Sequence, residues 1–62
     1  MDPNLVSRVR AEFVEMPGLR VTLPQAARLF GLSLRLAARI LAHLTHEGML
    51  MQLVDGRYAL RT

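Results

Sequence analysis

The stretch Thr22-Leu-Pro-Gln-Ala-Ala-Arg-Leu-Phe-Gly-Leu-Ser33 decides the fold of this chain. Thr22 and Gln25 can form a capping box, in which the threonine hydroxyl accepts from the Gln25 backbone N–H and the glutamine side chain reaches back. They begin a short helix, expected over about 23 to 30. Gly31 ends it, because glycine permits the left-handed backbone of a tight exit. Ser33 can cap a further helix, so the stretch predicts two helices joined by a sharp turn.

Another helix is expected before this stretch, over about residues 3 to 16. Asp2-Pro3 is typical of a helix start, and Pro17-Gly18 ends the helical pattern. Apolar residues recur between these signals at three- and four-residue spacing: Leu5, Val6, Val9, Phe13 and Met16. Arg8 and Glu12 lie four apart on the other side and are expected to pair. Residues 19 to 21 alternate apolar and polar, which suits a very short strand.

The helix that Ser33 begins is expected over about 33 to 47. At 100° per residue, one face carries Ala37, Ile40, Leu41 and Leu44, and the opposite side carries Arg35, Arg39, Ala42 and His46, with His43 at its margin. Asp55-Gly56 then separates two short runs and predicts a β-hairpin over about 50 to 61. A type I′ turn is expected there, because Asp-Gly favours positive φ at both central positions.

Composition limits the classes of protein that the chain can represent. Its 62 residues allow one small domain, and the absence of cysteine excludes disulfides and thiolate sites. No apolar stretch is long enough for a membrane span, and the first ten residues lack the core of a signal peptide. We therefore expect one soluble, cytoplasmic domain over residues 1–62. All eight basic residues are arginine and the net charge is +3, which favours a nucleic-acid partner.

The order of helix, short strand, helix, turn, longer helix and hairpin predicts a mainly α, three-helix winged helix-turn-helix with a small β-hairpin. Over residues 5 to 61 the chain resembles the N-terminal DNA-binding domain of IclR-type bacterial transcription regulators, and more loosely MarR-type ones. The residues that carry the resemblance are the stretch 22–33, Ala37, Arg39-Ile-Leu41, Leu44, Gly48 and Gly56-Arg-Tyr-Ala-Leu60.

The resemblance implies a small transcription regulator that binds double-stranded DNA. The helix from Ser33 would be its recognition helix, with Arg35 and Arg39 in the major groove and His43 at the margin. Arg20 and Arg28 would hold phosphates. The hairpin over about 50 to 61 would be the wing, and Arg57 at its tip would lie near a phosphate or a minor groove. The alternative for these arginines is a solvated surface without a partner.

Four apolar residues depart from the pattern of such regulators, in which polar or basic side chains are usual: Leu34, Leu36, Met51 and Leu53. They widen the apolar surface beyond what one buried face needs. They can be additional core, a dimer or partner interface, or contacts with thymine methyl groups. The second hypothesis for function is therefore a protein–protein interaction or dimerisation module, and both hypotheses are compatible with a homodimer.

Catalysis, metal binding and cofactor binding are not expected. The five carboxylates form no convincing pair with a histidine, and there is no glycine-rich phosphate loop. His43 and Glu47 lie four apart on one helix, but without cysteine or a carboxylate cluster an ordinary solvated helix end is the preferred interpretation. We expect neither an enzyme nor a small-molecule substrate.

Overall fold

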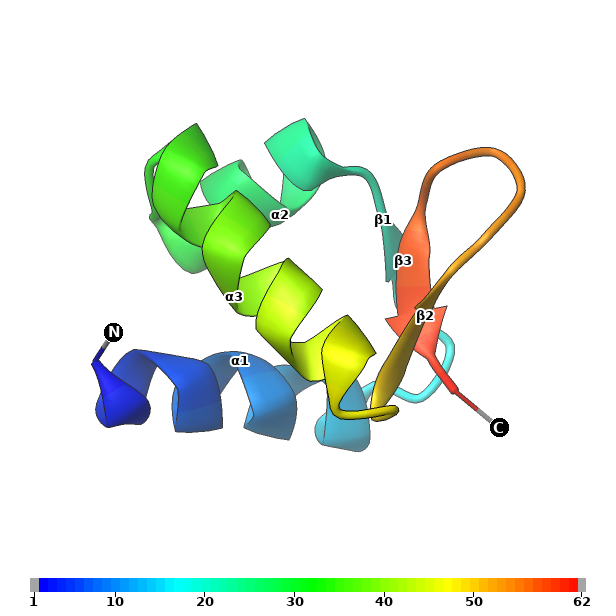
Figure 1. The fold of residues 1–62 in the computed structure, drawn as a ribbon, viewed down its shortest axis with the longest axis horizontal. Coiled ribbons are helices and arrows are strands. Elements are labelled where there is room, and N and C mark those ends of the chain that lie inside the picture. The colour runs from blue at the N-terminus through cyan, green and yellow to red at the C-terminus, as the bar shows by residue number, and fades with distance from the viewer. Residues whose placement is uncertain (1, 62) are drawn as a thin grey trace.

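The structure is a computed structural model and describes residues 2–61. These residues form three helices and a three-stranded antiparallel sheet (Figure 1). Their order is α1 (Pro3–Glu15), β1 (Arg20–Val21), α2 (Leu23–Phe30), α3 (Leu34–His46), β2 (Leu50–Gln52) and β3 (Tyr58–Leu60). The strands lie in the order β1-β3-β2. This confirms the mainly helical, winged helix-turn-helix architecture and the expected short strand before α2.

The signals at the ends of α2 and α3 act as predicted. Thr22 and Gln25 form both hydrogen bonds of the capping box, at 2.9 and 3.3 Å. Gly31 follows α2 in the left-handed conformation, with φ of 67°. The Ser33 hydroxyl accepts from the backbone N–H of Leu36 at 3.1 Å. Because these contacts are local, the two helices and their sharp turn follow directly from the stretch 22–33.

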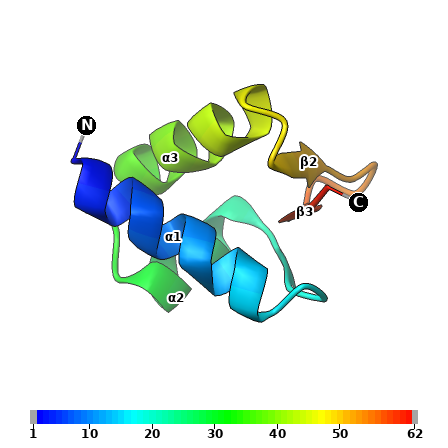
Figure 2. The same cartoon turned by 90° about the horizontal axis from the view of Figure 1, so that it is seen from below.

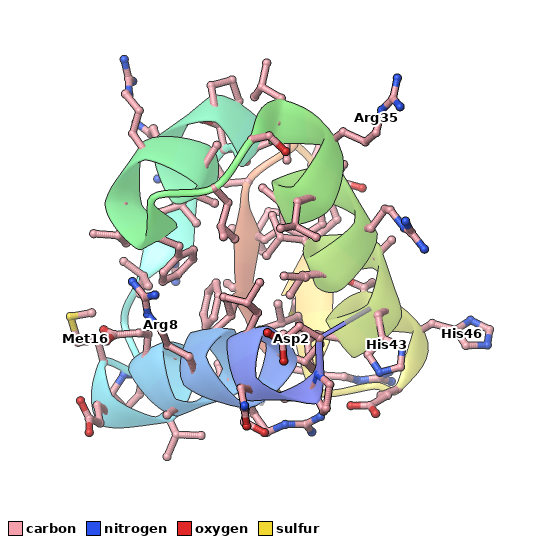
Figure 3. All side chains as sticks on the ribbon, turned by 90° about the vertical axis from the view of Figure 1, so that its left-hand side faces the viewer. Asp2, Arg8, Met16, Arg35, His43 and His46 are labelled. Atoms are coloured by element: carbon pink, nitrogen blue, oxygen red, sulfur yellow. The ribbon has the colours of Figure 1, made fainter. Side chains whose placement is uncertain are left out.

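The start of α1 is confirmed, whereas the pair expected along its side is not formed. The Asp2 side chain accepts from the backbone N–H of Asn4 at 2.8 Å. Arg8, however, does not pair with Glu12; its Nη2 donates to the carbonyl of Phe30 at 3.3 Å. Phe30 is the last residue of α2, where carbonyls lack helical partners, so the guanidinium satisfies a group that the helix leaves free. Figure 3 shows Arg8 directed from α1 towards α2.

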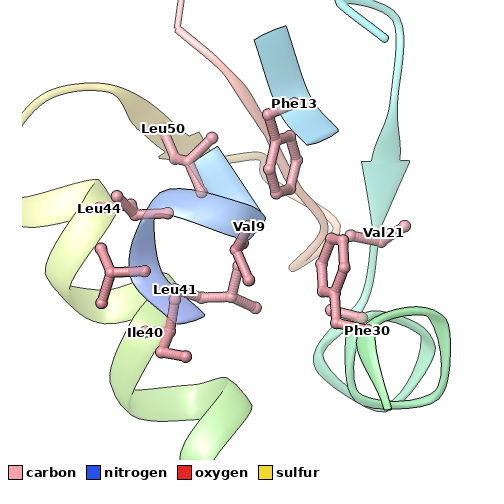
Figure 4. Close-up of a cluster of buried hydrophobic side chains, with 10 residues drawn as sticks. Val9, Phe13, Val21, Phe30, Ile40, Leu41, Leu44 and Leu50 are labelled. Atoms are coloured by element: carbon pink, nitrogen blue, oxygen red, sulfur yellow. The ribbon is translucent and has the colours of Figure 1, made fainter. Parts of the chain in front are cut away.

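The hydrophobic core lies where the three helices and the sheet meet (Figure 4). Its central side chains include Phe13 of α1 and Phe30 of α2, whose ring centroids are 6.2 Å apart with the planes tilted by 49°. The buried cluster consists of Val6, Val9, Phe13, Val21, Ala26, Phe30, Ile40, Leu41, Leu44 and Leu50. Every helix therefore contributes apolar side chains to one core. Met16, predicted for the apolar stripe of the first helix, is an exception: it lies just after α1 and is 42% exposed.

The hairpin between β2 and β3 forms, but its turn is not the predicted type I′. Leu53 donates to the carbonyl of Arg57 at 2.7 Å, and Gly56 donates to the carbonyl of Leu53 at 2.9 Å. Among residues 2–61 only glycines have positive φ, so Asp55 does not. The loop is three residues long, Val54 to Gly56, with glycine in the left-handed position. The Asp55 carboxylate accepts from the Arg57 backbone N–H at 3.0 Å, which favours this local turn over type I′.

Candidate nucleic-acid interface

Helix α3 has one face in the core and one face open to solvent. Figure 2 shows α3 along an edge of the molecule, with α1 and α2 on one side of it and no helix or strand on the other. The buried side chains of α3 are Ala37, Ile40, Leu41 and Leu44, and its exposed ones include Arg35, Arg39, Ala42 and His46. The two faces are those that the helical spacing predicted.

The side chains of Arg35 and Arg39 form no hydrogen bond and no ion pair with any part of the protein that the structure describes. Both are exposed, and Figure 3 shows Arg35 pointing away from the body of the protein. Three other arginines are engaged: Arg8 with Phe30, Arg10 with Glu47 and Arg57 with Asp55. The two guanidinium groups on α3 therefore remain available to an external acceptor or anion.

The segment that contains α2 and α3 carries arginines but no acidic residue. No aspartate or glutamate occurs between Glu15 and Glu47, a segment that includes all of α2 and α3 and carries four arginines. Two of them, Arg20 in β1 and Arg28 in α2, are exposed and, within residues 2–61, have no side-chain ion pair. The positive charge of this segment is therefore not neutralised by carboxylates of its own helices and strand.

The side chain of His43 contacts Glu47, the residue that follows α3. Its Nε2 lies 3.3 Å from Glu47 Oε2, and Arg10 Nη1 of α1 lies 2.9 Å from Glu47 Oε1. Glu47 therefore joins α1 to the end of α3 and holds His43 beside it. Arg10 had no predicted role, because its partner is distant in sequence. Within residues 2–61, no group of three or more histidines, cysteines or carboxylates is placed to hold a metal ion.

This ion-pair cluster predicts a pH-dependent contribution to stability. The hydrogen bond from Arg10, with the positive charges of Arg10 and His43, holds the pKa of the Glu47 carboxyl below its ordinary value. A carboxyl with a lowered pKa stabilises the folded state above its ordinary pKa, and this contribution is lost as the pH falls through the lowered value. Glu47→Gln is therefore expected to lower Tm at pH 6, by an amount that shrinks towards pH 3.

Thermal unfolding followed by circular dichroism at both pH values measures this effect. The control is Glu15→Gln, at an exposed glutamate for which the described residues provide no ion pair. It is expected to leave Tm unchanged at both values. An equal Tm loss in Glu47→Gln at pH 6 and pH 3 would contradict the electrostatic explanation.

Arg57 is engaged by a carboxylate within the wing, unlike the arginines of α3. Its Nε lies 2.8 Å from Asp55 Oδ2. The hydrogen bond from the Arg57 backbone N–H, and to a lesser extent that from its side chain, holds the pKa of the Asp55 carboxyl below its ordinary value. The loop of the wing also contains Val54, which is fully exposed. The loop of the wing therefore presents an apolar side chain and a neutralised pair of charges.

The four apolar candidates do not form one surface. Leu34, 56% exposed, begins α3, while Met51, 39% exposed, lies in β2 beyond the other end of that helix. Leu36 is half-buried and packs against the core, so for this residue the interpretation as additional core is favoured. Leu53 is half-buried at the start of the wing loop. Figure 1 shows the start of α3 and β2 on opposite sides of the molecule.

An open groove of about 480 Å³ lies where α2 turns into α3. Its lining is mainly apolar with one arginine: Pro24, Ala27, Arg28, Gly31, Leu32 and Leu34. It thus places the exposed Leu34 next to a cationic side chain.

Searches against models of protein families, curated proteins and solved structures found no significant match to this chain. Over residues 2–61, none of the helices has both the length and the apolar character needed to cross a bilayer.

Proposed function

We propose that this protein binds double-stranded DNA with α3 as its recognition helix, as a small transcription regulator of the cytoplasm. The observation that carries the proposal is the pair Arg35 and Arg39. They lie four residues apart on the open face of α3 and, within residues 2–61, have no protein partner. Arginine is the side chain that most often binds guanine in the major groove, through two parallel hydrogen bonds.

The shape of α3 supports the same proposal. The major groove is about 12 Å wide, and an α-helix with its side chains is about 10–12 Å in diameter. Between and beyond the two arginines, the open side of α3 carries the small side chains of Ala38 and Ala42. Small residues there let the helix backbone approach the base edges, so the arginines can reach them without obstruction.

Phosphate contacts are assigned to Arg20 and Arg28, which are exposed on β1 and α2. Contacts to phosphates position a protein on the duplex but carry no sequence information. Arg57 is a weaker candidate, because a phosphate would have to compete with Asp55 for its guanidinium. His43 is likewise held beside Glu47. The proposed interface therefore consists of four arginines on β1, α2 and α3.

Salt dependence tests the proposal directly. Each neutralised phosphate lowers log K by about 0.9 per unit of log salt concentration, so contacts from Arg20 and Arg28 predict a slope of about −1.8 or steeper. Fluorescence anisotropy of a labelled duplex of mixed sequence, titrated between about 50 and 200 mM salt, measures it. Arg28→Ala is expected to flatten the slope by about 0.9, and Arg61→Ala, at the end of the sheet, to leave it unchanged. A slope near zero would rule out binding of this kind.

A second candidate function is self-association through the start of α3. Leu34 is 56% exposed and lines the apolar groove, so a second copy of the chain could bury it there. Arg28 lines the same groove, so self-association there competes with the phosphate contact assigned to that residue.

Substitution of two leucines distinguishes an interface from the core. Leu34→Glu is expected to convert a dimer into a monomer and to leave the helix content unchanged, since Leu34 is exposed. Leu36→Glu is expected to lower Tm, because this half-buried side chain packs against the core and a carboxylate there loses solvation. Light scattering gives the mass and circular dichroism the helix content. A parent chain that stays monomeric at high concentration would rule out self-association.

A further inference from the structure

The spacing of the two free arginines on α3 carries information about the DNA sequence that the chain prefers. Arg35 and Arg39 lie one helical turn apart, so the rise between them along the helix axis is about 6 Å. Successive base pairs are separated by about 3.4 Å along each strand. If α3 lies along the major groove, the two guanidinium groups therefore meet base pairs about two steps apart.

The chemistry of the two side chains selects the base. A guanidinium only donates hydrogen bonds, and guanine is the base that offers two acceptors, O6 and N7, side by side in the major groove. Adenine offers N7 beside a donor, so it cannot accept a bidentate pair from arginine. The residues beside the arginines on the open side, Ala38 and Ala42, have no polar side-chain atom with which to read another base.

The neighbouring residues that the structure describes leave the guanidinium groups of Arg35 and Arg39 without a carboxylate partner. Among the described residues, carboxylates engage Arg10 and Arg57, whereas Arg35 and Arg39 have no such partner. The segment between Glu15 and Glu47 contains no carboxylate at all. Binding to guanine therefore requires no internal ion pair of α3 to be broken.

We infer that the preferred duplex carries two G·C pairs about two base-pair steps apart, with Arg35 reading one guanine and Arg39 the other. This inference rests on the proposed function, namely that α3 enters the major groove. It goes beyond that function by assigning base specificity to two residues and a distance between the bases that they read.

A panel of labelled duplexes tests the inference with the full chain. Each duplex is about 20 base pairs long and places two G·C pairs one, two, three or five steps apart in A·T sequence; an A·T-only duplex is the reference. The duplex with two steps is expected to bind most tightly. The loss of either guanine is expected to weaken binding between about 5-fold and about 150-fold, the discrimination that a bidentate contact provides.

Base analogues and arginine variants then assign each contact. Replacing one guanine with 7-deazaguanine removes the N7 acceptor and keeps Watson–Crick pairing, so it is expected to weaken binding by the parent chain at either position. Arg35→Ala is expected to lose sensitivity to the analogue at one position, and Arg39→Ala at the other. Arg61→Ala, a control with the same change of charge at the end of the sheet, is expected to retain both sensitivities.

The outcomes separate the inference from the function on which it rests. Binding that depends on salt but is equal for all duplexes, or unaffected by 7-deazaguanine, overturns the inference and leaves the proposed DNA binding in place. Tightest binding at another spacing overturns the assignment of the two arginines to bases two steps apart. Failure to bind any duplex at low salt overturns both. Circular dichroism of each variant checks that the fold is retained.

Discussion

Replacing Phe13 with alanine is expected to leave much of the protein unfolded at room temperature. The Phe13 side chain is completely buried, and its ring packs against Phe30 with centroids 6.2 Å apart. Removing a buried phenylalanine side chain typically costs about 3–5 kcal/mol. At about 0.05–0.15 kcal/mol per residue, a chain of 62 residues has a free energy of unfolding of only about 3–9 kcal/mol. The loss is therefore comparable with the whole stability.

Urea unfolding followed by circular dichroism measures this prediction. Val14→Ala is the matched control, because Val14 neighbours Phe13 on the same helix but is 58% exposed. Its expected change in the free energy of unfolding is within about 0.5 kcal/mol. Similar midpoints for the two variants would show that the core does not depend on the Phe13–Phe30 contact.

Replacing both Arg35 and Arg39 with alanine is expected to abolish tight DNA binding without unfolding the protein. A bidentate contact to guanine contributes about 1–3 kcal/mol, so two independent contacts together correspond to an affinity loss between about 30-fold and about 2 × 10⁴-fold. Both side chains are exposed and, over residues 2–61, hold no other residue in place. Alanine is also the best helix former, so α3 is expected to persist.

Fluorescence anisotropy with a duplex that carries two G·C pairs measures this loss, and the charge-preserving variant Arg35→Lys/Arg39→Lys shows its origin. Lysine keeps the positive charge but lacks the planar fork, so this variant is expected to bind more tightly than the alanine variant and less tightly than the parent. Affinity equal to that of the parent in the alanine variant would contradict a role for α3 in DNA binding.

The helices could be predicted because their signals are local. The capping box of Thr22 and Gln25, the left-handed Gly31 and the Ser33 cap each involve contacts within a few residues, and the structure has all of them. The apolar spacing on α3 likewise gave its buried and open faces correctly. The outward direction of Arg35 and Arg39 follows from that spacing, since residues opposite a buried stripe face outward.

Contacts between distant parts of the chain could not be predicted in this way. The expected Arg8–Glu12 pair was wrong, because the end of α2 brings the Phe30 carbonyl within reach of Arg8. The ion pair of Arg10 with Glu47 likewise depends on how α1 packs against α3. At the wing, a carboxylate contact between Asp55 and Arg57 selects a three-residue loop instead of a type I′ turn.

The amino-acid sequence by itself determined the helices, their order and the direction of their apolar faces, because capping and helical periodicity act over one or two turns. Only the tertiary structure decided which arginines are neutralised and which stay free, and that Leu36 packs on the core while Leu34 does not. A charged or apolar side chain has many partners within reach in an unfolded chain. The packing of the helices and the sheet leaves each one with few neighbours, and these neighbours determine what it can bind.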